Sequence, residues 1–156
     1  MAAGLLVLAP LPGRAVGLDT VSDPTFAQAI VGPGAAIEPL RAVLDVVAPI
    51  SGKLLKVFPH AFVVVAADGR GVLVHLGIDT VQLKGEGFTL LAQQGDTVTA
   101  GDPIVSYDVP AIVAGGRDPI VPVIVLERQG EDISLSDAVA AGLQLAPGDA
   151  FLTVNR

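Results

Sequence analysis

Short apolar runs recur along the chain, and Gly, Pro and Asp residues separate them. Val, Ile and other strand-forming residues dominate these runs and often alternate with polar residues, a pattern typical of half-buried strands. The 18 Gly and 12 Pro residues interrupt any long helical period. The pattern predicts an all-β fold, either a β-sandwich or a barrel, with one or two very short helices.

Two internal repeats in the sequence predict a duplicated structural unit. The segments VLAPLPGRAVGL and VVAPISGKLLKV share the frame A-P-x-x-G-x-x-x-x-[LV], which starts at Ala9 and Ala48. A Gly-Asp turn followed by an alternating strand occurs near Gly101 and again near Gly148. We therefore expect two related halves that pack against each other.

Helix signals are few. Asp23 can cap a helix that starts at Pro24, and Ser134 can cap an alanine-rich turn that stops at Gly142.

The two histidines of the chain, His60 and His75, lie in neighbouring apolar runs. The segment 67–71 between the runs has the composition of a tight hairpin loop, which makes the two strands antiparallel neighbours. Facing residues on such strands lie roughly 5 Å apart at Cβ, so the histidines are within reach of one site. The structural alternative is two ordinary core histidines with satisfied ring nitrogens, and it stays open at this point.

Length and charge limit the class of protein. Residues 1–156 are enough for a single domain, and the hydrophobic fraction of 51% excludes a disordered chain. The net charge of −7 argues against binding to nucleic acid or to an anionic membrane. No apolar run is long enough for a membrane span, so we expect no membrane insertion.

The absence of cysteine excludes disulfides, thiol nucleophiles and thiolate metal sites. The opening residues lack the basic region of a secretion signal, and we interpret them as a first strand and turn. These features indicate a cytoplasmic protein.

The segment GVLVHLGIDTVQLKGEGF, from Gly71 to Phe88, resembles the signature of the glucose-type enzyme IIA component of the bacterial phosphoenolpyruvate-dependent sugar phosphotransferase system. The upstream HAF sits where that family has its second histidine. The segments SDPTFAQAIVGPGAAIEP, VVAPISGKLLKVF and GDTVTAGDPI extend the resemblance, which covers the chain from about Leu5 to Val154.

The resemblance implies an antiparallel β-sandwich of the duplicated hybrid barrel-sandwich type. It also implies that His75 accepts a phosphoryl group on Nε2 from the carrier protein HPr. His75 then passes the group to a cysteine of an enzyme IIB domain, and His60 stabilises the phosphate. An unprotonated Nε2 requires the proton on Nδ1 and an acceptor to hold it there, which by the family pattern is the Gly77 carbonyl. The resemblance implies no cofactor and no metal, and it leaves the sugar open.

Further residues near the histidines have both a functional and a structural interpretation. Asp79 has two functional interpretations: it orients the loop after His75, or its charge repels the phosphate. The structural interpretation is a turn in which Asp79 bonds nearby backbone N–H groups. For Thr80 we favour the turn. Four apolar residues are expected to form a rim that docks the partners, with ordinary strand core as the alternative: Phe58, Phe62, Leu73 and Leu76.

The chain departs from the family at Phe58-Pro59-His60. Family members usually carry two more residues here, often with a threonine that fixes the ring of the histidine. Pro59 also removes a backbone donor beside the site. The orientation of His60 is therefore left open, and we expect either a contact from elsewhere that replaces the missing donor or a rearranged site.

Two other classes of function compete with a phosphocarrier. His75 and Asp79 match the H-x-x-x-D spacing of zinc-dependent peptidases with related duplicated folds, but the chain lacks their H-x-H pair and any third histidine. A biotinyl or lipoyl module is suggested by APISGKLLKV, yet such domains carry a lysine next to methionine at a hairpin tip. The single methionine here is Met1.

Overall fold

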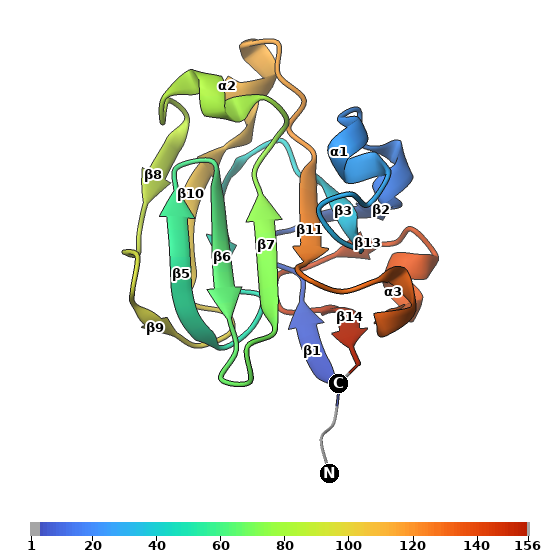
Figure 1. The fold of residues 1–156 in the computed structure, drawn as a ribbon. Coiled ribbons are helices and arrows are strands. Elements are labelled where there is room, and N and C mark those ends of the chain that lie inside the picture. Colours follow the sequence, from blue (N-terminus) through green and yellow to red (C-terminus); the bar gives the residue numbers. More distant parts are fainter. Residues whose placement is uncertain (1–3, 156) are drawn as a thin grey trace.

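The structure is a computed structural model that describes residues 4–155 (Figure 1). The strands of this part of the chain are β1 (Leu5–Leu8), β2 (Gly13–Val16), β3 (Gly34–Pro39), β4 (Val43–Val47), β5 (Gly52–Phe58), β6 (Ala61–Val65), β7 (Gly71–His75), β8 (Phe88–Leu90), β9 (Thr97–Val98), β10 (Pro103–Asp108), β11 (Val121–Val125), β12 (Ile133–Leu135), β13 (Gln144–Leu145) and β14 (Ala150–Val154). The α-helices are α1 (Pro24–Ala27), α2 (Val109–Ala114) and α3 (Asp137–Ala140), and the 3₁₀ helices are η1 (Leu18–Thr20), η2 (Thr80–Leu83) and η3 (Gly130–Asp132).

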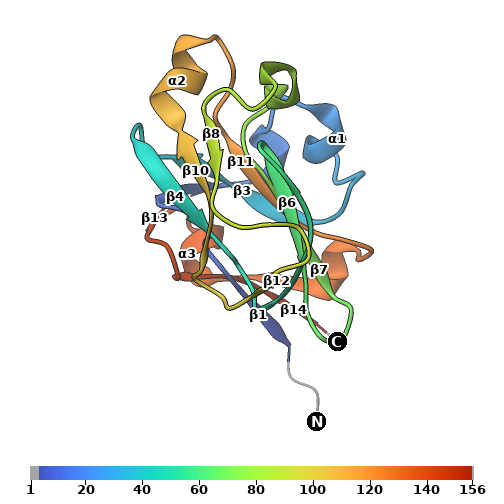
Figure 2. The ribbon, with the colours of Figure 1, turned by 90° about the vertical axis from the view of Figure 1, so that its left-hand side faces the viewer.

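Within residues 4–155 the strands form one large sheet and two small ones, and every pairing is antiparallel. The large sheet has the order β13-β2-β3-β11-β7-β6-β5-β9, and the small sheets have the orders β4-β10-β8 and β1-β14-β12. Figure 2 shows the β4-β10-β8 sheet lying against the part of the large sheet that contains β6 and β7. The expected all-β antiparallel sandwich is confirmed.

Main-chain hydrogen bonds relate the two halves of the fold. The Leu8 N–H donates to the Pro49 carbonyl at 2.9 Å, and the Val47 N–H donates to the Pro10 carbonyl at 2.8 Å. The two bonds are equivalent. In each, the residue before the alanine of one A-P frame donates to the proline carbonyl of the other frame. The repeat seen in the sequence therefore corresponds to a paired unit of structure.

The two Gly-Asp turns also make equivalent hydrogen bonds in the two halves of the fold. The Ala9 N–H donates to the Asp149 carbonyl, and the equivalent Ala48 N–H donates to the Asp102 carbonyl, both at 2.8 Å. Each aspartate also accepts a backbone hydrogen bond at its Oδ2 atom, which closes its own Gly-Asp turn. The same turn chemistry thus ends both halves of the sandwich.

The helix predictions are correct for α1 and need correction for the other two helices. Asp23 caps α1 as expected, with Pro24 as its first residue. The expected cap at Ser134 is wrong: Ser134 lies in β12, and the Oγ of Ser136 accepts from the Val139 N–H instead. Helix α2 was not predicted, although its cap at Asp108 and its early proline repeat the signal that begins α1.

Two groups of buried side chains lie on opposite faces of the large sheet. Along β7, Val72 and Val74 face the main core between the sheets, whereas Leu73 packs against a second cluster. That second cluster includes Phe26 of α1 and Leu18 of η1. The alternation of a strand therefore places His75, like Leu73, on the outer face beside α1.

Candidate functional site

The hairpin of β6 and β7 brings the two histidines together. His75 is the last residue of β7 and pairs with Ala61, so His60 lies one residue beyond the paired end of β6. The Leu76 N–H donates to the His60 carbonyl at 2.7 Å, which extends the ladder past the strand ends. The ring centroids of His60 and His75 are 5.3 Å apart and meet edge to face. The predicted hairpin and the shared location of the histidines are thus present in the fold.

The His75 ring is held by a backbone carbonyl. Its Nδ1 atom lies 2.7 Å from the Gly77 carbonyl oxygen, a geometry in which a protonated Nδ1 donates to that oxygen. Gly77 itself has a φ of +81°, and its N–H donates to the Ile120 carbonyl. The loop therefore selects the tautomer that leaves the Nε2 lone pair free.

Phe26 contacts the His75 ring, and sequence reasoning did not place it in the site. The two ring centroids are 5.0 Å apart and the rings are tilted by 52°. Phe26 reaches the ring because Asp23 caps α1 through the Thr25 N–H at 2.9 Å. The capped helix was readable from the sequence, but its contact with a strand so far along the chain was not.

Burial lowers the pKa of both histidines below the ordinary value of 6.5. For His75 the main cause is desolvation, which the hydrogen bond to Gly77 and the negative charges of Asp23 and Asp79 partly oppose. For His60 desolvation is again the main cause, and the nearby His75 adds to it by Coulombic repulsion. The lowered pKa values favour the neutral form of both rings at pH 7, the form that a nitrogen nucleophile requires.

These lowered pKa values predict a pH-dependent stability. The unfolded chain binds more protons than the folded protein between the folded values and 6.5, so the histidines' contribution to stability is complete above pH 6.5. It is lost as the pH falls from 6.5 through the folded pKa values. We expect wild type to lose more free energy of unfolding between about pH 7.5 and about pH 5.5 than a variant with both histidines replaced by Gln. Urea denaturation measures this difference, and equal losses would contradict the prediction.

Gly77 is required for both its conformation and its lack of a side chain. A Cβ atom there would lie 2.6 Å from the Thr80 Cγ2 atom and 3.0 Å from the Asp118 carbonyl oxygen. We expect Gly77→Ala to lower the free energy of unfolding by roughly 2–4 kcal/mol and to shift the carbonyl that holds His75.

Gly69→Ala is the matched control, because Gly69 has a φ of +93° and a Cβ atom there would meet no other atom within 4 Å. Gly69→Ala measures the loss of unfolding free energy that comes from the positive φ alone, which we expect to be about 1 kcal/mol. Urea denaturation and the ¹⁵N shifts of the His75 ring measure the two effects. Equal losses in the two variants would show that the contacts around Gly77 contribute nothing.

Asp79 and Thr80 have different roles in the loop after His75. Thr80 is buried and its hydroxyl donates to the Leu76 carbonyl at 2.6 Å, which is a turn contact. Asp79 is exposed with a left-handed backbone, and its side chain makes no capping hydrogen bond to η2. Its carboxylate instead acts on His75 through charge, and the Arg117 guanidinium donates to its backbone carbonyl at 3.4 Å.

The four residues expected to form a docking rim divide into two pairs. Phe58 is 49% exposed, and Leu73 is half-buried on the outer face. The expectation is wrong for Phe62 and Leu76, which are both 0% exposed and belong to the main core. Phe62 points inward because the alternation of β6 places it on the face of the sheet opposite to Val63.

Comparisons with known proteins agree on one family. The sequence model of the family described as "phosphoenolpyruvate-dependent sugar phosphotransferase system, EIIA 1" matches residues 5–130. The chain belongs to this family. Its members are phosphocarriers, so the expected function in the sugar phosphotransferase system is confirmed at the level of the family.

Individual EIIA relatives cover most of the chain. A "PTS system glucose-specific EIIA component" of Staphylococcus epidermidis is 40% identical over 137 residues, which span 86% of this chain and 81% of the relative. A protein of the same name from Halalkalibacterium halodurans is 41% identical over 122 residues, 77% of this chain and 69% of the relative. Among solved structures, the glucose permease IIA of Mycoplasma capricolum matches with a TM-score of 0.86 and 33% identity, covering 97% of this chain and 96% of that one.

Membership of the EIIA family does not support the alternative of a zinc-dependent hydrolase. The biotinyl or lipoyl alternative also receives no support, because the family model itself spans the APISGKLLKV segment that suggested it. No helix within residues 4–155 has the length and hydropathy needed to cross a membrane.

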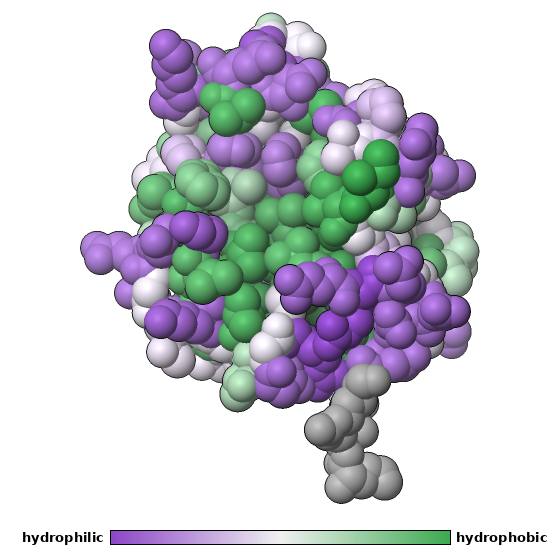
Figure 3. Space-filling model, in the orientation of Figure 1, coloured by the Kyte–Doolittle hydropathy of each residue, from purple (hydrophilic) through white to green (hydrophobic). Residues whose placement is uncertain are grey.

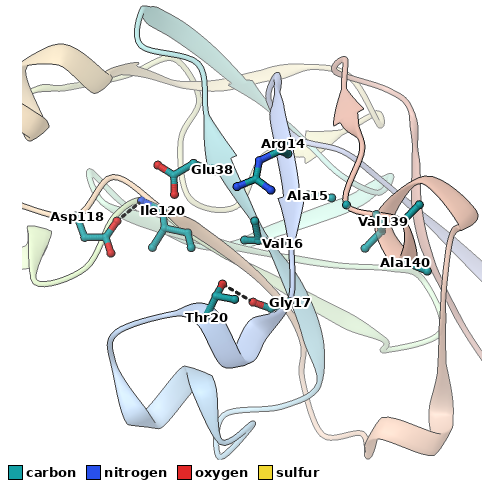
Figure 4. Close-up of a pocket in the computed structure, with 12 residues that line it drawn as sticks. Arg14, Ala15, Val16, Gly17, Thr20, Glu38, Asp118, Ile120, Val139 and Ala140 are labelled. Atoms are coloured by element: carbon teal, nitrogen blue, oxygen red, sulfur yellow. Dashed lines mark hydrogen bonds between the residues drawn. The ribbon is translucent and has the colours of Figure 1, made fainter.

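A separate polar cavity of about 470 Å³ lies between β2, β3 and α3. Figure 4 shows Arg14 and Glu38, a cross-strand pair, at its edge. The Glu38 carboxylate forms an ion pair with Arg41 at 3.2 Å, and the Ile120 N–H donates to the Asp118 carboxylate. Neither histidine lines this cavity. It is therefore distinct from the histidine site.

Proposed function

We propose that this EIIA domain accepts a phosphoryl group from phospho-HPr on the Nε2 atom of His75 and passes it to a cysteine of an enzyme IIB domain. The observation that carries the proposal is the 2.7 Å contact between His75 Nδ1 and the Gly77 carbonyl, which directs the free lone pair to Nε2. The transfer takes place in the cytoplasm, and the IIB domain belongs to a membrane sugar permease.

Each half of the transfer moves one phosphoryl group and one electron pair. In the first half, the His75 Nε2 lone pair bonds to phosphorus, and the electrons of the broken P–N bond return to the histidine of HPr. In the second half, the thiolate of the IIB cysteine bonds to phosphorus, and the P–N electrons return to His75 Nε2. Such transfers depend chiefly on the positions of the reacting groups and on stabilisation of charge at the phosphoryl oxygens.

His60 is the candidate for stabilising that charge. Its ring lies edge to face with His75, and within residues 4–155 neither of its ring nitrogens has a hydrogen-bond partner. A phosphoryl group on His75 brings negative charge next to this ring. That charge favours a protonated His60, which can donate a charge-assisted hydrogen bond to a phosphoryl oxygen.

The outer face around the histidines suits successive protein partners. Figure 3 shows an apolar surface that crosses β5, β6 and β7 toward α1. Its exposed or half-buried apolar side chains include Leu55, Phe58, Val63, Val65 and Leu73. Because the domain carries a net charge of −7, a partner with a basic rim around its own apolar centre fits this face best.

The test is the intact mass of the protein after incubation with phosphoenolpyruvate, enzyme I and HPr. We expect the mass to rise by one phosphoryl group, and acid to remove that group. Addition of a glucose-specific IIB domain is then expected to return the mass to its starting value, because the named relatives are glucose-specific. An unchanged mass in the presence of active enzyme I and HPr would contradict the proposal.

A further inference from the structure

The His60 ring is supported by another ring from its own hairpin. Phe58 is the last residue of β5, and a two-residue turn of Pro59 and His60 leads to β6. The ring centroids of Phe58 and His60 are 5.9 Å apart, and the rings are inclined by only 29° in a stacked arrangement. Pro59 fixes its own φ, which limits the backbone freedom of this tight turn.

Within residues 4–155 the His60 side chain has ring neighbours and no hydrogen-bond partner. The His60 backbone is anchored, because its carbonyl accepts from the Leu76 N–H at 2.7 Å. Its imidazole has Phe58 as one ring neighbour and His75 as another. In the part of the chain that the structure describes, nothing hydrogen-bonds to its ring nitrogens.

We propose that Phe58 is a positioning residue for His60: its ring holds the imidazole against His75, in place of a hydrogen-bonding side chain. This inference rests on the proposed function, since His60 acts only when a phosphoryl group is on His75. It also assigns a contact to the shortened Phe58-Pro59-His60 segment, where the family's threonine is absent.

Phe58 then has two roles on the apolar face: it positions His60 and it contributes to partner docking. Phe58 is 49% exposed, so one side of its ring remains available to a partner while the other side packs against His60. Loss of the ring would let His60 leave the orientation in which its N–H faces the phosphoryl oxygens. Small misplacements of a positioned group lower turnover strongly, and they do so without a matching loss of partner affinity.

Three variants separate positioning from docking. Phe58→Leu keeps an apolar side chain but removes the planar ring, whereas Phe58→Tyr keeps the ring and adds a hydroxyl at an exposed edge. Leu55→Ala is the docking control, because Leu55 is 47% exposed on the same strand, three residues before Phe58, and lines a surface pocket together with Val65.

The kinetic measurement is phosphoryl transfer from each phosphorylated variant to the IIB domain. We expect Phe58→Leu to lower kcat about tenfold with little change in KM. Phe58→Tyr is expected to transfer within about twofold of wild type, and Leu55→Ala to raise KM at an unchanged kcat. A Phe58→Leu variant that changes only KM, as Leu55→Ala does, would assign Phe58 to docking alone and overturn the inference.

A second measurement needs neither HPr nor IIB. In the isolated protein, ¹⁵N-resolved NMR of the His60 ring follows its pKa, which burial and the neighbouring His75 lower. Because Phe58→Leu exposes the ring, we expect the His60 pKa to rise toward 6.5, while Leu55→Ala leaves it in place. If Phe58→Leu leaves both the pKa and the ¹⁵N shifts of the His60 ring unchanged, the positioning role is overturned.

The two measurements distinguish a failure of the positioning role from a failure of the proposed function. If wild type is never phosphorylated, the proposed function fails, and the NMR measurement still decides whether Phe58 holds His60. If wild type transfers normally and Phe58→Leu is unchanged in both measurements, the proposed function stands and the positioning role fails.

Discussion

The His75→Gln variant is expected to gain no phosphoryl group when it is incubated with phosphoenolpyruvate, enzyme I and HPr. An amide nitrogen delocalises its lone pair into the carbonyl, so it cannot act as the nucleophile that a neutral imidazole provides. His75 has the geometry for that role, because the Gly77 carbonyl binds Nδ1 at 2.7 Å and burial lowers the pKa of the ring. We expect the rate of phosphorylation to fall by at least about 10³-fold, which intact mass and a rapid-quench time course measure.

The control is a stability measurement, which shows that the His75→Gln variant is folded. Gln occupies a volume similar to that of His and contributes no charge, so we expect the free energy of unfolding to change by about 1 kcal/mol or less. A folded His75→Gln protein that still gains a phosphoryl group would place the nucleophile elsewhere, with His60 as the first candidate.

The His60→Gln variant is expected to separate the two halves of the reaction. Acceptance from phospho-HPr should stay within a few-fold of wild type, because the His75 ring, its Gly77 contact and its Phe26 contact do not depend on His60. Transfer onward to IIB should fall about 10²–10³-fold, the usual cost of removing one donor that stabilises charge in a transition state. Gln can donate a hydrogen bond but cannot take up the proton that a phosphoryl group next to His60 favours.

Single-turnover transfer in each direction measures this separation. The phosphorylated His60→Gln protein is isolated first, and its decay is then followed with and without the IIB domain. Equal losses in acceptance and in onward transfer would show that His60 supports the shape of the site and has no separate role toward the phosphate.

The hairpin that carries the histidines was predictable because its signals are local. Two apolar runs of β-branched residues flank Gly69, and the antiparallel register then places His60 beside His75. The role of Gly77 was also readable, but only through the resemblance to the family. The space around Gly77 depends on Thr80 and on Asp118, which lies far along the chain and was not predictable from local pattern.

The apolar rim shows where sequence reasoning fails. Phe58, Phe62, Leu73 and Leu76 look equivalent in composition, yet two of them are fully buried and two reach the outer face. The strand alternation separates Phe62 from its neighbours only once the core side of the sheet is known, and that side depends on what packs against the sheet. The capping error at Ser134 has a similar origin, because pairing of β12 with β14 takes Ser134 into a strand.

The sequence by itself determined the strand-rich fold class, the duplicated A-P frames, the histidine hairpin and the family to which these motifs are similar. These features depend on local patterns and short-range turns, which single residues such as Gly69 and Asp23 encode directly. Only the tertiary structure decided that Phe26 packs on the His75 ring, that Phe58 stacks on His60, and which apolar residues are exposed. Those contacts depend on which face of the sheet is covered and by which distant segment, and burial of the apolar surface of the whole chain determines that choice.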